Sequence, residues 1–100
     1  MKNYVSCVID MKATGRNIRR LRLKSGLTVG EICSSLGIEN QVSYFKWQRG
    51  QSLPSLSHFV KLAMIFRTSI DNILAVRVVN TKEEEESNEA PLPYFFLYNG

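Results

Sequence analysis

Side chains able to act as acids, bases, nucleophiles or metal ligands are few in this chain of 100 residues, and they do not cluster. His58 is the only histidine, and Cys7 and Cys33 lie too far apart for the paired cysteine spacing of a zinc site. Five of the nine carboxylates fall within residues 81–100, and no phosphate-binding glycine loop or nucleophile motif is present. We therefore expect no catalysis, no metal and no cofactor.

The basic residues are more informative, because they are concentrated in one part of the chain. Residues 1–80 hold 12 lysines and arginines against 4 carboxylates, a balance of +8, whereas residues 81–100 hold 1 against 5. A basic segment of this kind favours an anionic partner, and nucleic acid is the foremost candidate. Solvated surface charge is the alternative, and composition alone does not separate the two.

Composition also indicates the class of protein. Hydrophobic residues make up 44% and charged residues 22%, the usual mix of one globular domain. No apolar run exceeds five residues, whereas a membrane-spanning helix needs about 20. Asp10 interrupts the apolar stretch near the N-terminus, which argues against a signal peptide. We expect a cytoplasmic protein that does not contact a membrane.

The N-terminal part of the hydrophobic pattern predicts a short extended arm at residues 4–9 and then a helix from about 15 to 24. Thr14 is the expected N-cap of this helix, and Gly26 is the expected left-handed residue after its end. Arginines fill most of its polar positions, namely Arg16, Arg19, Arg20 and Arg22. Such a density suits contacts with phosphate, although a solvated face is the ordinary explanation.

Two further helices follow, with a turn between them. The second begins at a capping box, in which the side chains of Thr28 and Glu31 each accept a hydrogen bond from the other's amide, and it stops at Gly37. Its buried positions are Ile32, Cys33 and Leu36. The third covers about residues 41–48, with Asn40 as its candidate cap. Tyr44 and Trp47 form its inward face, and the side chains expected to point away are Gln41, Val42, Phe45, Lys46 and Arg49.

The fourth and fifth helices complete a predicted all-α domain. Ser55 caps the fourth helix, whose predicted core stripe consists of Leu56, Phe59, Leu62, Ala63 and Phe66. Ser69 caps a short fifth helix, with Asp71 in its first turn, where the helix dipole favours a carboxylate. The residues that bury this last helix are Ile70, Ile73 and Leu74.

The C-terminal segment differs in character from the rest. Residues 82–89 contain no apolar side chain and predict a solvated linker, whereas residues 94–98 hold four of the ten aromatics. So many aromatics indicate docking on the domain, on a second subunit or on another protein, for example by strand pairing with residues 4–9. A free tail is the alternative. The predicted divisions are an N-terminal arm at 1–13, a helical domain at 14–79, and an acidic linker with an aromatic tail at 80–100.

Several short motifs occur in a characteristic order along the helical domain. They are Gly26-Leu27-Thr28, Leu36-Gly37-Ile38, Trp47-Gln48-Arg49-Gly50, Leu53-Pro54-Ser55-Leu56 and Ser69-Ile70-Asp71-Asn72-Ile73-Leu74. Over about residues 14–75 the chain resembles the phage-repressor-like, XRE-type helix-turn-helix DNA-binding proteins. The resemblance implies a five-helix lambda-repressor-like domain whose third helix enters the major groove of DNA.

Three positions depart from the family pattern. Gly37 and Trp47 are ten residues apart, one more than in most of the family, so the turn is longer. Gln48 stands where the family usually carries a glutamate that pairs with an arginine such as Arg22. Cys33 occupies a position that prefers alanine, so we interpret it as a small buried residue.

The resemblance, together with the available donor groups, implies a set of DNA contacts. Amides near the start of the second helix face phosphate, polar side chains of the third helix reach base edges, and Phe45 lies against a thymine methyl group. Arginines hold the phosphate backbone. The candidate DNA-binding residues are Gln41, Val42, Ser43, Phe45, Lys46, Arg49, Thr28, Val29, Arg16 and Arg19.

The first functional hypothesis is a sequence-specific transcriptional regulator that binds double-stranded DNA as a homodimer at a palindromic operator. The second is an antitoxin or protein-interaction adaptor built on the same helical domain, with the C-terminal tail capturing a protein partner. RNA binding is less favoured, because the sequence offers no clear aromatic stacking platform.

Overall fold

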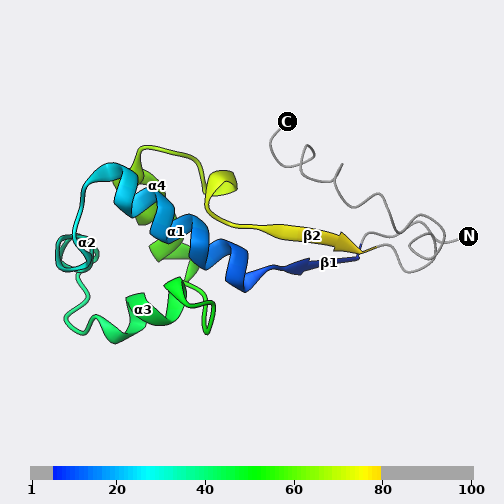
Figure 1. The fold of residues 1–100 in the computed structure, drawn as a ribbon, viewed down its shortest axis with the longest axis horizontal. Coiled ribbons are helices and arrows are strands. Elements are labelled where there is room, and N and C mark those ends of the chain that lie inside the picture. Colours follow the sequence, from blue (N-terminus) through cyan, green and yellow to red (C-terminus); the bar gives the residue numbers. More distant parts are fainter. Residues whose placement is uncertain (1–5, 80–100) are drawn as a thin grey trace, which may run out of the picture.

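The computed structural model describes residues 6–79, which form a helical body and a two-stranded ribbon that projects from it (Figure 1). The elements in chain order are β1 (Ser6–Ile9), α1 (Met11–Ser25), α2 (Val29–Leu36), α3 (Val42–Gln48), α4 (Leu56–Phe66), the 3-10 turn η1 (Ile70–Asn72) and β2 (Val76–Val79). None of the helices in this part of the chain is long and apolar enough to cross a membrane.

The ribbon corrects the prediction of an all-α domain. β1 pairs antiparallel with β2, with Ser6 opposite Val79 and Ile9 opposite Val76. Residues 4–9 were expected to be extended, and the described part of that arm is a strand. Its partner among residues 6–79 is β2, a Val-Arg-Val-Val segment whose β-branched side chains suit a strand. The suggested pairing with the aromatic tail lies outside the described residues.

Helix α1 begins one turn earlier than the sequence predicts, because Asp10 caps it in place of Thr14. The Asp10 carboxylate accepts a hydrogen bond from the Ala13 amide at 2.9 Å. Thr14 instead lies inside the helix, only 1% exposed, and its hydroxyl accepts from the amide of Ala75 at 2.9 Å. Thr14 therefore ties α1 to the segment that leads into β2, and its expected capping role is wrong.

The predicted ends of α2 are confirmed, whereas α3 begins one residue later than predicted, with Gln41 at its N-cap position. The Thr28 hydroxyl accepts from the Glu31 amide at 3.0 Å, and the Glu31 carboxylate accepts from the Thr28 amide at 2.8 Å. Gly37 ends α2 in the left-handed conformation, with φ of 76°. The Asn40 side chain accepts from the Val42 amide at 2.8 Å, which satisfies a free donor at the start of α3.

The core lies between the four α-helices and η1. Its buried apolar residues are Ile18, Leu21, Ile32, Cys33, Leu36, Tyr44, Trp47, Phe59, Leu62, Ala63, Phe66 and Ile73. Two expectations at this end of the domain are wrong. Leu56 does not belong to the core, because it sits at the first position of α4 and is 74% exposed. The fifth helix is only the single 3-10 turn η1, and the Ser69 side chain makes no capping hydrogen bond to it.

Helix α1 packs very closely against the C-terminal end of α3, and Gly15 makes this approach possible. A methyl group on Gly15 would overlap the backbone carbonyl oxygens of Trp47 and Gln48. Only hydrogen fits there, so the backbones of the two helices meet directly at this point. The contact fixes α3 relative to the basic helix α1.

Candidate nucleic-acid interface

The outward surface of α3 carries polar, basic and small apolar side chains. Ser43 and Lys46 are exposed, and Val42 is 52% exposed, while Tyr44 and Trp47 on the other side are buried. This division into two faces is the predicted one. Gln41 before α3 and Arg49 after it are also exposed, so both ends of the helix continue the same polar surface.

Phe45 departs from the expectation that it points away from the core. Its side chain is half-buried and packs against the core, with its ring edge-on to Tyr44 at 5.7 Å between ring centroids. The ring therefore has less free surface than the neighbouring Val42 side chain. The physical reason is its position at the boundary between the two faces of α3, where a large side chain folds back onto apolar neighbours.

The starts of α2 and α3 lie side by side. The amide nitrogen of the Gln41 side chain lies 3.4 Å from the position that a methyl group on Gly30 would occupy. The capping box already uses the amides of Thr28 and Glu31. Among the described residues, the backbone amides left without an acceptor at this end of α2 belong to Val29 and Gly30. These donors sit at the positive end of the helix dipole, where an anion is favoured.

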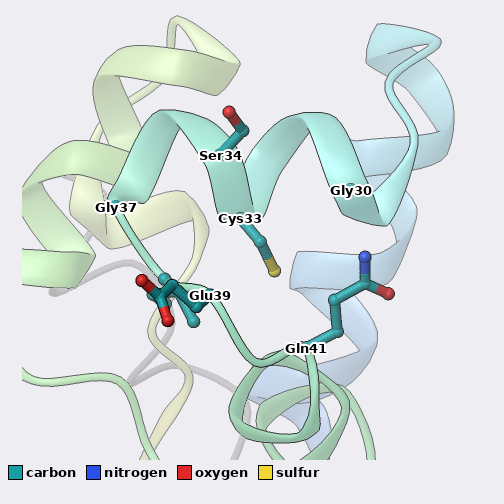
Figure 2. Close-up of a pocket in the computed structure, with 7 residues that line it drawn as sticks. Gly30, Cys33, Ser34, Gly37, Glu39 and Gln41 are labelled. Carbon is teal, nitrogen blue, oxygen red and sulfur yellow. The ribbon is translucent and has the colours of Figure 1, made fainter.

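A groove of about 480 Å³ runs between α2 and the turn that leads to α3 (Figure 2). Figure 2 shows the Cys33 side chain directed into the space between α2 and this turn, with Glu39 and Gln41 on the turn side. Cys33 is buried, as its interpretation as a small core residue requires, and burial raises the pKa of its thiol. Among residues 6–79, no group of three or more histidine, cysteine or acidic side chains could hold a metal ion.

Arg22 of α1 lies near Tyr44 of α3, at the position where the family usually has an arginine–glutamate pair. The Tyr44 hydroxyl donates to the Gln48 side-chain oxygen at 2.9 Å, and Arg22 donates to the Leu27 carbonyl at 3.0 Å. Burial raises the pKa of Tyr44, and the neighbouring Arg22 opposes part of this rise. The Arg22 Nε is buried without an acceptor among the described residues.

Of the predicted arginines of α1, Arg16, Arg19 and Arg20 are exposed and Arg22 is half-buried, and the helix geometry puts Arg19 at the edge of the α3 surface. Arg19 lies one turn after Gly15, on the side of α1 that meets α3, and its charge lowers the pKa of the buried Tyr44. Arg16 follows Gly15 directly. Lys12, which was not among the predicted site residues, is exposed, and its Cα would lie 2.8 Å from a methyl group on Gly50. No local signal in the sequence reveals this proximity, because it comes from the packing at Gly15.

The comparisons with known proteins agree with this arrangement. A family model described as helix-turn-helix matches residues 18–73. No curated protein matches the chain. The solved structures include the restriction-modification controller protein C.AhdI from Aeromonas hydrophila, which is 25% identical in sequence with a TM-score of 0.58. The likeness covers 64% of this chain and 96% of C.AhdI. The chain therefore belongs to the XRE-type helix-turn-helix family of DNA-binding transcriptional regulators.

Proposed function

We propose that this protein regulates transcription by reading a short DNA sequence through the outward face of α3. The observation that carries the proposal is the exposed row of Val42, Ser43 and Lys46, which stands opposite the buried Tyr44 and Trp47. Major-groove edges differ in their donors, acceptors and methyl groups, so a helix bearing all three types of contact can distinguish base pairs.

Individual roles follow from the chemistry of each side chain. Lys46 suits the two acceptor atoms of a guanine, and Gln41 and Ser43 offer hydrogen bonds to base edges. Val42 suits a thymine methyl group better than Phe45 does, because the Val42 side chain is 52% exposed whereas the Phe45 ring is half-buried against the core. Phe45 then supports the helix and contributes its ring edge to the same surface.

Phosphate contacts would position the domain on the duplex. The free amides of Val29 and Gly30, helped by the exposed Thr28, suit a phosphate at the start of α2. The remaining candidates are exposed side chains around the α3 surface, namely Arg16, Arg19, Arg49 and Lys12. Such contacts add affinity and orientation without sequence information.

Two copies of the chain would bind a palindromic operator in the cytoplasm. Support comes from α4, whose outer side exposes Leu56, Val60 and Met64 at 74%, 43% and 72%. A spacing of four residues puts them on one stripe without charge. In an antiparallel pair of α4 helices, Val60 would meet its own copy and Leu56 would meet Met64 of the second copy. A self-complementary patch of this kind suits a two-fold dimer.

The α3 assignment is tested by Lys46→Ala, with Lys61→Ala on α4 as a matched loss of one exposed lysine. We expect Lys46→Ala to weaken binding to the selected site by about 1–3 kcal/mol and to relax preference at one base pair. Lys61→Ala should leave the selected motif unchanged. Binding-site selection followed by titration measures both. Equal effects of the two variants on every sequence would contradict base reading, and no DNA binding at low salt would favour the adaptor.

The dimer is tested by Met64→Glu, which puts a charge into the α4 stripe, with Lys61→Glu as the control on the same helix. We expect sedimentation to show monomers for Met64→Glu and dimers for the control, because the new carboxylate would be desolvated against Leu56 of the second copy without a partner for its charge. Affinity for a palindrome should fall with the loss of the dimer. A dimer that survives Met64→Glu would exclude this stripe as the interface.

A further inference from the structure

The ribbon has one face made entirely of apolar side chains. In the antiparallel register Cys7 lies opposite Val78, and Ile9 lies opposite Val76. Directly opposite residues share a face, and so do residues two apart on one strand. Cys7, Ile9, Val76 and Val78 therefore point to the same side, while Val8 and Arg77 point to the other.

The helical body does not cover this face. Cys7 is exposed, Ile9 is 42% exposed, and Val76 and Val78 are half-buried. None of the four residues belongs to the domain core or to the side chains that pack against it. Figure 1 shows the ribbon extending away from the helices. Because a two-stranded ribbon is only marginally stable alone in water, we expect another apolar segment to pack against this face.

We infer that residues 94–98 of the same chain cover the apolar face of the ribbon. This segment, Tyr-Phe-Phe-Leu-Tyr, contains no glycine, no proline and no charged residue. In an extended conformation its first, third and fifth rings share one side, so that side alone presents three aromatics to the ribbon. The prolines at 91 and 93 favour the extended backbone just before it.

The chain length allows this return. Residues 80–90 leave directly from the end of β2 and can span about 36–40 Å when fully extended. The four-residue strands of the ribbon are only about 13 Å long. The linker can therefore turn and bring residues 94–98 back along the ribbon. A tether this short gives an effective concentration near the millimolar range, which favours the same chain over a second copy at micromolar protein.

Cys7 reports directly on the cover, because its thiol lies on the face in question. Its rate of alkylation by a maleimide is measured in the full chain and in a chain that ends at residue 90. We expect the shortened chain to react about tenfold faster or more, since thiol reactivity follows access. Buried Cys33 is the internal control and should react slowly in both. Equal Cys7 rates in two folded proteins would overturn the inference.

A disulfide test identifies the occupant. In a Cys33→Ala chain, Phe96→Cys should oxidise rapidly with Cys7 into a monomeric cross-linked product. Ser87→Cys, in the acidic linker of the same chain, controls for mere tethering and should cross-link more slowly. Cross-linked dimers in place of monomers would assign the face to a second copy. Equal rates for Phe96→Cys and Ser87→Cys would contradict a docked tail. Neither outcome depends on DNA binding, so the proposed function is tested separately.

Discussion

Three consecutive residues of α3 have three different environments, and their types alone predict only two of them. Trp47 is buried and Lys46 is exposed, as the helical period requires, whereas Phe45 lies between the two faces and packs partly on the core. Periodicity assigns a direction to each side chain, but it does not say how far a large ring will bend toward apolar neighbours.

This difference leads to a graded stability series. Trp47→Ala should lower the free energy of unfolding by about 3–5 kcal/mol, enough to unfold much of so small a domain. Phe45→Ala should cost roughly half as much, because its ring is half-buried. Lys46→Ala should change stability by less than about 0.5 kcal/mol. Urea titrations of the three variants measure the series. A loss at Phe45 as small as that at Lys46 would contradict its packing on the core.

The raised pKa of Tyr44 predicts a loss of stability in alkali. The phenol of the unfolded chain ionises near pH 10, while the buried phenol holds its proton to higher pH. From about pH 10 upward the unfolded state binds fewer protons than the folded state, so the free energy of unfolding falls as pH rises. Tyr44→Phe should remove the part of this fall that begins near pH 10. Cys33, whose thiol pKa is also raised, contributes a fall that begins near pH 9, so Cys33→Ala is the needed background.

At the scale of the elements, the α1–α3 contact depends on a single missing side chain. Gly15→Ala should destabilise the domain by about 1–3 kcal/mol or more, because the new methyl group meets two backbone carbonyls. Gly30→Ala is the matched control, since it lies in a helix with space for a methyl group and should stabilise by up to about 1 kcal/mol. Thermal melts of the two variants show whether each substitution lowers or raises the stability of the domain. A neutral Gly15→Ala would show that the two helices can separate without cost.

The elements that were predicted correctly depend on local interactions. The capping box of Thr28 and Glu31 and the left-handed Gly37 are set by residues within a few positions, so the sequence shows them directly. The ribbon and the hydrogen bond from Ala75 to Thr14 join residues about 60 or more positions apart. No local pattern encodes such pairings. Leu56 was wrongly assigned to the core for a related reason. Its position fits the helical period of the buried face of α4, but no other part of the domain packs against it.

The candidate site was predictable to a similar degree. The outward row of α3 follows from the spacing of its buried aromatics, and the start of α2 follows from its cap. The sequence does not reveal that the capping box occupies the Thr28 amide and leaves the amides of Val29 and Gly30 without an acceptor among the described residues. It also does not show that Lys12 approaches the end of α3, because that proximity comes from the packing at Gly15.

For the whole molecule, the charge balance predicts a strong dependence of DNA binding on salt. If five or six phosphates are contacted, the logarithm of the affinity should fall with the logarithm of salt at a slope of about −5. Arg19→Ala should reduce the magnitude of this slope by about 1 while leaving the preferred sequence unchanged. Titrations between low and moderate salt measure it. A flat dependence would contradict phosphate contacts by the basic surface.

The pairing of β1 with β2 has a consequence for how the domain is made. Ser6 pairs with Val79 across more than 70 intervening residues, so the ribbon closes the largest loop in the described chain. Closure of such a loop is slow, because its entropy cost comes before the favourable contacts form. The short helices instead form contacts between near neighbours. On the ribosome β1 is synthesised first and remains without its partner until β2 emerges. The apolar first strand is thus the part of the domain that spends longest exposed during synthesis.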